Sequence, residues 1–281
     1  MIVDCHTHVS LTTDDAEIGE QLAGTETVDA CIVLAVPDGS SEEVNKRLAE
    51  YVARHSNKMV GFAVVNPPED KIGIDSLQAI QENLRLDGLV LHCAACGFHP
   101  ANSRAMRFYE SAQELDLPVF FHNGDVDLNR DAVLDYAQPY LLDEIGRVFP
   151  ELKIIIGDMG VPFVEQTLSM VAKHKNVYAD LTIQPGKVWQ TYNIVVAAHE
   201  RRVMEKLLFG SGFPLGNAGD CIETLLGFNM LLADTNLPTV PRGHIRAIVE
   251  RDTLGLLGID RDKIKPRENK APLCAPGKEE D

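Results

Sequence analysis

Residues 2–8 of the chain, Ile-Val-Asp-Cys-His-Thr-His, predict the strand around which the rest of the sequence is organised. Successive side chains of a strand point to opposite faces, so His6 and His8 point the same way. Two neutral imidazoles on one face can bind a single divalent metal ion. Asp4 lies on the same face and could brace these ligands with its carboxylate. A single His-x-His can equally be two polar side chains where a strand reaches solvent, so the metal hypothesis depends on the rest of the chain.

Short apolar runs that alternate with helical patterns continue along the sequence. Some helices carry a start signal, such as Ser40 or Ser41 as an N-cap ahead of two glutamates. The predicted strands are residues 2–8, 30–36, 59–65, 88–92, 118–122, 153–158, 176–181 and 207–211. This alternation predicts an α/β fold with a parallel sheet, and the number of strands predicts a single (β/α)₈ TIM barrel.

One domain is predicted for residues 1–258, followed by a charged, proline-containing tail at residues 259–281. An open, doubly wound sheet is the alternative architecture. No Gly-x-Gly-x-x-Gly motif follows the first strand, which argues against a dinucleotide-binding fold.

Composition excludes several classes of function. The chain of 281 residues has 45% hydrophobic residues, enough for a large core, and a formal net charge of -16. A nucleic-acid-binding protein would need a basic surface, and no run of Lys and Arg supplies one. No apolar run approaches the roughly 20 residues that span a bilayer, and the sequence begins directly with a strand, so we expect neither a membrane protein nor a signal peptide.

Cysteine usage indicates a reducing compartment. The six cysteines are scattered through mostly apolar segments. Cys93-Ala-Ala-Cys96 has the spacing of a metal or redox pair, but no second pair accompanies it. We therefore expect reduced thiols and a cytoplasmic location.

The predicted strands end repeatedly in residues that can bind metal or move protons. In a barrel, the carboxyl ends of the strands carry the active residues. The residues at those ends are His6, His8, His92, His122, Asp158, Asp180 and Gly212. Any one of the polar residues could be a chance occurrence, but a set of ligand-type residues at successive strand ends indicates a metal site.

The sequence resembles the amidohydrolase superfamily, in particular the branch that includes aminocarboxymuconate-semialdehyde decarboxylase and related hydrolases. The resemblance covers about residues 1–258. The segments that carry it are 3–8 (VDCHTH), 88–92 (GLVLH), 117–124 (LPVFFHNG), 157–160 (GDMG), 176–180 (NVYAD) and 208–214 (LFGSGFP). Each segment is a weak signal, whereas their order and spacing together are specific. The resemblance implies a metal ion bound by His6, His8 and His122. Zinc is the expected ion, and manganese is the alternative.

Two positions depart from the pattern of that family. The family usually has a histidine after the glycine of the sixth strand, where this chain has Asp158. It also ends the eighth strand with Phe-Gly-Ser-Asp-x-Pro, where this chain has Gly212 in place of the aspartate. In the family, that aspartate binds the metal and relays the proton of the attacking water. Because glycine offers neither function, we expect the metal to have an open side facing the eighth strand.

Asp158 is the residue that could compensate. It could be a fourth metal ligand, a general base for water, or only a cap on the helix that follows. His92 and Asp180 are candidate substrate-binding residues at strand ends. Arg104 could bind a substrate carboxylate, although a surface role is the more common one for an arginine.

Two functions remain open from the sequence. The first is a metal-dependent hydrolase, or a non-oxidative decarboxylase, acting on a small organic molecule, for which the resemblance suggests a homodimer. The second, motivated by Gly212, is a catalytically degenerate barrel that binds a ligand or partner without turnover.

Overall fold

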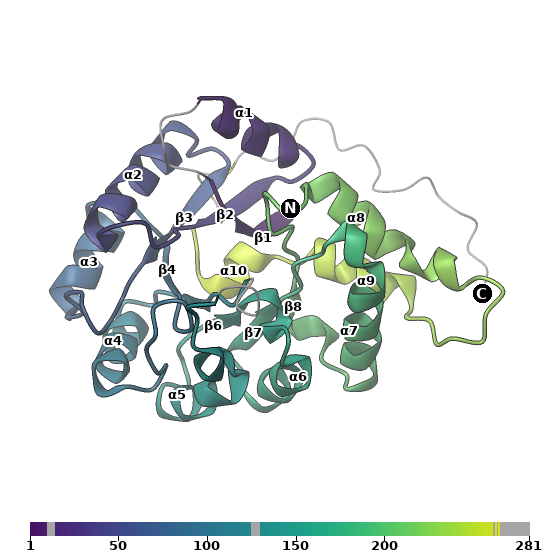
Figure 1. Ribbon diagram of the computed structural model, residues 1–281. Coiled ribbons are helices and arrows are strands. Elements are labelled where there is room, and N and C mark those ends of the chain that lie inside the picture. The colour runs from purple at the N-terminus through teal and green to yellow at the C-terminus, as the bar shows by residue number, and fades with distance from the viewer. Residues whose placement is uncertain (10–14, 125–129, 261, 263, 265–281) are drawn as a thin grey trace.

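Eight parallel strands, each paired with the next in the chain, form the centre of the structure (Figure 1). The structure is a computed structural model, and it describes residues 1–9, 15–124, 130–260, 262 and 264. The strands are β1 (Val3–Thr7), β2 (Ala30–Leu34), β3 (Met59–Val64), β4 (Gly88–Leu91), β5 (Val119–Phe121), β6 (Ile154–Ile156), β7 (Val177–Asp180) and β8 (Leu207–Leu208). Every strand is buried throughout, as expected for a parallel sheet covered by helices. The predicted (β/α)₈ TIM barrel is confirmed.

The barrel closes between β1 and the residues that follow β8. Cys5 N–H donates to the carbonyl of Phe209 at 2.9 Å, and Gly212 N–H donates to the carbonyl of His6 at 2.9 Å. The regular strand β8 is therefore shorter than the predicted strand at 207–211, although the residues that follow β8 still form hydrogen bonds with β1. Gly212 has a φ of 63°, in the left-handed region that favours glycine, and this turns the chain out of the extended conformation.

The described residues form ten α-helices, most of which surround the strands, while α10 lies near the middle of the view (Figure 1). The Ser40 side chain accepts a hydrogen bond from Glu43 N–H, so the predicted N-cap is confirmed. The helices are α1 (Asp15–Gly24), α2 (Ser41–Arg54), α3 (Ile74–Glu82), α4 (Ser103–Glu114), α5 (Asp143–Val148), α6 (Val164–Lys173), α7 (Val188–Glu200), α8 (Ala218–Gly227), α9 (Arg242–Val249) and α10 (Thr253–Leu257).

Helical structure is interrupted before α5 and after α9. The chain before α5 forms 3₁₀ turns at Leu134–Ala137 and Pro139–Leu142, because Pro139 has no N–H to continue a helical ladder. After α9, the Asp252 side chain accepts from Gly255 N–H and starts α10 as a new helix.

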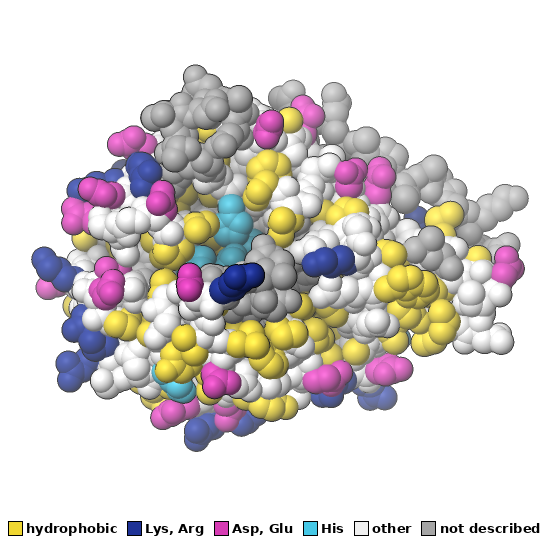
Figure 2. All heavy atoms as spheres, viewed as in Figure 1, with side chains coloured by type: hydrophobic (Ala, Val, Ile, Leu, Met, Phe, Trp, Pro, Cys, Tyr) yellow, Lys and Arg dark blue, Asp and Glu magenta, His cyan; other side chains and the backbone are white. Residues whose placement is uncertain are grey.

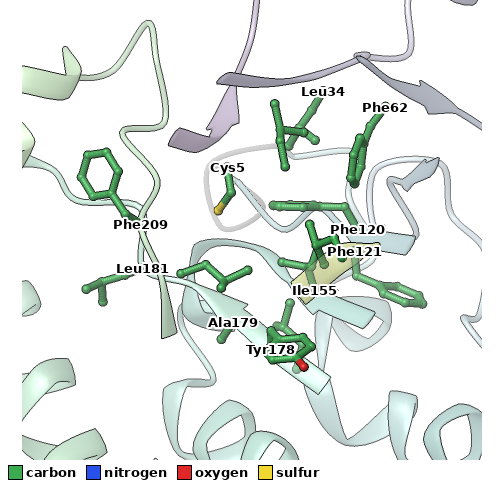
Figure 3. Packing of buried hydrophobic residues seen from close by; sticks show 14 of the residues in the cluster. Cys5, Leu34, Phe62, Phe120, Phe121, Ile155, Tyr178, Ala179, Leu181 and Phe209 are labelled. Carbon is green, nitrogen blue, oxygen red and sulfur yellow. The ribbon is translucent and has the colours of Figure 1, made fainter. Parts of the chain in front are cut away.

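Large apolar side chains fill the barrel (Figure 3). Phe62, Phe120 and Phe209 are fully buried. Truncating such a side chain to alanine typically destabilises a protein by about 3–5 kcal/mol. Because the interior is packed rather than hollow, a ligand can be bound only at an end of the barrel.

The predicted tail at residues 259–281 is described only at its start. Ile259 and Ile264 are buried, whereas residues 261, 263 and 265–281 lie outside the described residues. No helix in the described part of the chain is long and apolar enough to cross a membrane.

Candidate metal centre

Three histidine rings converge at the carboxyl end of the barrel, on a face where histidine side chains come to the surface (Figure 2). His6 belongs to β1, His8 follows it, and His122 follows β5. Nε2 of His8 lies 3.1 Å from Nε2 of His6 and 3.0 Å from Nε2 of His122. Nitrogens bound to one zinc ion at 2.0–2.1 Å in tetrahedral geometry would be about 3.3 Å apart. The structure therefore brings the predicted ligand atoms to nearly the spacing that a shared metal ion requires.

Asp180, at the end of β7, orients the His6 ring. Its Oδ2 atom lies 2.5 Å from Nδ1 of His6, and it also accepts a hydrogen bond from the Thr182 hydroxyl. Thr182 N–H donates to the other carboxylate oxygen at 3.0 Å. Burial raises the pKa of Asp180, but His6 and Thr182 together lower it below its ordinary value. With Nδ1 of His6 donating to this carboxylate, Nε2 faces the other histidines.

His8 is held by a backbone carbonyl. Nδ1 of His8 lies 3.0 Å from the carbonyl oxygen of Leu34, and because a carbonyl only accepts, this nitrogen carries the proton. Nε2 of His8 therefore presents a lone pair to the centre of the cluster. Burial, together with the charge of His6, lowers the pKa of His8 to about 3, so this lone pair is available at neutral pH.

The donor set fits a divalent cation. Two ring nitrogens that face each other at 3.1 Å need a proton or a cation between them. Burial lowers the pKa of His6, but the carboxylates of Asp158 and Asp180 outweigh it and raise this pKa to about 9. A cation bound at this place would displace that single proton and would be balanced by the same carboxylates.

His122 and His92 pack against each other, with ring centroids 4.6 Å apart. Gly124 N–H donates to Nδ1 of His122 at 3.3 Å, which is a long hydrogen bond. A metal bound to Nε2 would move the ring proton to Nδ1, and this hydrogen bond would then be lost. Nε2 of His92 donates to the carbonyl of Ala35 at 3.0 Å, and burial lowers the pKa of His92 to about 4. His92 is thus a neutral side chain behind His122.

Asp158 lies beside the three histidines without joining their group. Its Oδ1 atom is 4.0 Å from Nδ1 of His6, and its N–H donates to Asp180 Oδ2 at 3.2 Å. The possible ligand atoms of Asp158, His6 and Asp180 all lie within 4.8 Å of one another. Those of the three histidines do so as well, but Asp158 does not belong to the histidine group. It is not the cap of the next helix either, since α6 has Phe163 at its N-cap. Because Asp158 does belong to a second group of possible ligands, with His6 and Asp180, it stays a candidate both for a metal ligand and for a general base.

The methyl group of Thr182 lies close to Gly212. A Cβ atom at Gly212 would lie 2.6 Å from Cγ2 of Thr182. A side chain at position 212 would therefore displace Thr182, while the open side of the metal expected from the sequence stays a prediction.

His122 packs closely against Gly124, which lines a neighbouring cavity. A Cβ atom there would be 2.7 Å from Cε1 of His122 and 3.3 Å from Oδ2 of Asp158. A cavity of about 150 Å³ adjoins this point, lined by residues that include Asp158, Thr182, Gln184, Lys187 and Gln190. A small molecule in this cavity would lie next to the Asp158 carboxylate.

Two of the predicted substrate-binding residues are directed elsewhere. Asp180 is fully buried behind His6, so it acts on that ring rather than on a substrate. The Arg104 guanidinium donates to the carbonyls of Pro67 at 2.7 Å and Asp70 at 2.6 Å. These bonds hold the loop after β3 and favour a structural role for Arg104.

Sequence reasoning missed Thr182, Gly124 and Lys187. Thr182 follows Asp180 by two positions, so the alternation of a strand was a usable signal that both face the same way. Gly124 and Lys187 lie in loops, where no periodicity indicates which way a residue points.

Comparison with known proteins identifies a family and a shared fold. The amidohydrolase family model matches residues 3–229. A comparison with curated proteins gives no match.

Solved structures share the fold at low sequence identity. A probable 2-pyrone-4,6-dicarboxylic acid hydrolase from Acinetobacter baumannii, with citric acid bound, is 15% identical, with a TM-score of 0.63 over 92% of this chain and 99% of that chain. A 5-carboxyvanillate decarboxylase from Sphingomonas paucimobilis is 14% identical, with a TM-score of 0.62 over 92% and 99%. A dihydroxybenzoic acid decarboxylase from a Polaromonas species, with bound manganese and an inhibitor, is 15% identical, with a TM-score of 0.59 over 92% and 96%.

Proposed function

The chain belongs to the amidohydrolase family, and from that premise we propose that it is a metal-dependent hydrolase acting on a small organic substrate. The observation that carries the proposal is the convergence of His6, His8 and His122 next to the Asp158 carboxylate. The metal would be bound by His6, His8 and His122. Zinc is the ion that we propose, and manganese is the alternative.

Each residue of the site has a distinct task in this mechanism. The bound metal supplies Lewis acidity, which polarises a substrate oxygen and lowers the pKa of water. Asp158 accepts the proton of the attacking water and returns it to the leaving group. Asp180 fixes the His6 ring through Nδ1, and Thr182 fixes the Asp180 carboxylate.

The cavity beside Gly124 would determine where the substrate lies. The reacting carbon would be placed in this cavity, next to the Asp158 carboxylate. From this place, Asp158 is within reach of a water molecule that attacks the substrate.

A non-oxidative decarboxylase is the second candidate. The decarboxylases from Sphingomonas paucimobilis and the Polaromonas species have the same fold, and the latter contains manganese. In that reaction Asp158 would deliver a proton to the carbon that loses carbon dioxide. The metal ligands and the substrate position would be unchanged.

Turnover with and without metal tests the proposal. We expect the protein loaded with zinc or manganese to act on at least one member of a panel of small lactones, esters, amides and aromatic acids. Chelation should abolish this turnover, and added metal should restore it. A loaded protein that turns over no member of the panel would instead favour the catalytically degenerate barrel suggested by Gly212.

A further inference from the structure

We infer that the substrate carries an anionic group at one end and that Lys187 binds this group, an inference that rests on the proposed function. Lys187 ends the 3₁₀ turn Pro185–Lys187 and immediately precedes α7. Lys187 is not among the strand-end residues that indicated the metal site in the sequence.

Two cavities meet at Asn123 and Gly124. The first, of about 150 Å³, is lined by residues that include Asp158, Lys187 and two glutamines. The second, of about 380 Å³, is lined by residues that include Val36, Pro37, Ala94, Ala95, His92 and His122. A substrate that reaches from one cavity to the other would have one end beside Lys187 and the other beside the histidines.

Lys187 carries the only positive charge among the described residues that line the first cavity. None of the ion pairs formed by the described residues involves Lys187, so its ammonium group is available to a ligand. Arg104, the cation expected from the sequence to bind a carboxylate, donates to backbone carbonyls instead. Lys187 is thus the cation that the cavity offers to an anion.

The N-terminus of α7 also makes the electrostatic potential in the first cavity more positive. Gln190 and Thr191, in its first turn, line the cavity, and the side chain of the N-cap residue, Lys187, makes no capping hydrogen bond. The partial positive charge of a helix N-terminus favours an anion within about one turn. The helix supports the lysine and is not a site by itself.

The charge of the rest of the protein makes a local cation necessary. The chain has a formal net charge of -16, and Asp158 lies in the same cavity. An anion would be repelled by this surrounding charge unless a positive group compensates for it at short range. With its charged end at Lys187, the substrate would extend past Gly124 toward His122, and its other end would enter the second cavity.

The experiment measures the binding of two matched probes to the metal-loaded full chain. Isophthalate has two carboxylates, and its monomethyl ester has one carboxylate and a neutral group of similar shape. We expect wild-type protein to bind isophthalate about tenfold more tightly than the ester, the typical contribution of a hydrogen bond to a charged group. This ratio should fall to near unity in Lys187→Gln, remain in Lys187→Arg, and be unchanged in Lys71→Gln, which removes an exposed charge elsewhere.

The outcomes separate this inference from the proposed function. A protein that retains metal but binds both probes equally, or neither, contradicts the role of Lys187 alone. The same holds if Lys187→Gln keeps the tenfold ratio. A protein that holds no metal overturns both the proposed function and the inference built on it.

Discussion

Turnover should fall by about 10²–10⁴-fold when Asp158 is replaced by asparagine, the usual contribution of a general acid or base. Asparagine keeps the size of the side chain and leaves the backbone N–H of residue 158 free to donate to Asp180. It cannot accept the proton that the reaction releases. Because Asp158 is outside the three-histidine group, the metal content of the variant should stay close to that of the wild type.

The measurement combines the turnover number on the best substrate of the panel with metal analysis of the same sample. Asp75→Asn, at an exposed position in the first turn of α3, is the matched control and should change neither quantity. If Asp158→Asn loses its metal, Asp158 is a ligand and not a base. Unchanged turnover would remove any role for Asp158 in the chemistry.

The second large effect concerns Gly212, where the family has an aspartate. We expect Gly212→Asp to lower the free energy of unfolding by about 2–4 kcal/mol and not to restore the site of the family. The φ of 63° is unfavourable for any residue with a Cβ atom, and that atom would lie 2.6 Å from Cγ2 of Thr182. Moving Thr182 would also disturb Asp180 and, through it, His6.

A second substitution separates the steric effect from the backbone effect. Thr182→Ser removes Cγ2 but keeps the hydroxyl that donates to Asp180. Chemical denaturation should show that Gly212→Asp combined with Thr182→Ser recovers about 1–3 kcal/mol relative to Gly212→Asp alone. If the two substitutions are additive, the methyl group of Thr182 does not obstruct position 212, and the structural account of this departure is wrong.

The sequence was sufficient for the barrel and for the convergence of the histidines. Apolar strand runs alternating with helices predict the topology, and the rule that active residues lie at the carboxyl ends of barrel strands brings His6 and His122 together. In the structure their ring centroids are 5.0 Å apart, although the residues are far apart in the chain. The roles of these residues as metal ligands stay a prediction.

The details around the histidines depend on contacts that no local pattern encodes. Asp180 was predicted to bind substrate, but its position behind His6 follows from the pairing of distant strands, with the two residues 174 positions apart. The crowding at Gly212 depends on one methyl group of Thr182. Lys187 precedes α7 in a loop, where the direction of a side chain is set by tertiary packing.

Metal analysis of the purified protein is the most direct test of the proposed centre. After equilibration with zinc or manganese at neutral pH and dialysis, we predict about one tightly bound ion per chain. His8→Ala should lose this ion, because His8 supplies the nitrogen that lies between those of His6 and His122. His99→Ala, at an exposed histidine outside the cluster, should retain it. Wild-type protein that emerges without metal, or His8→Ala protein that binds it as tightly as the wild type, would contradict the account.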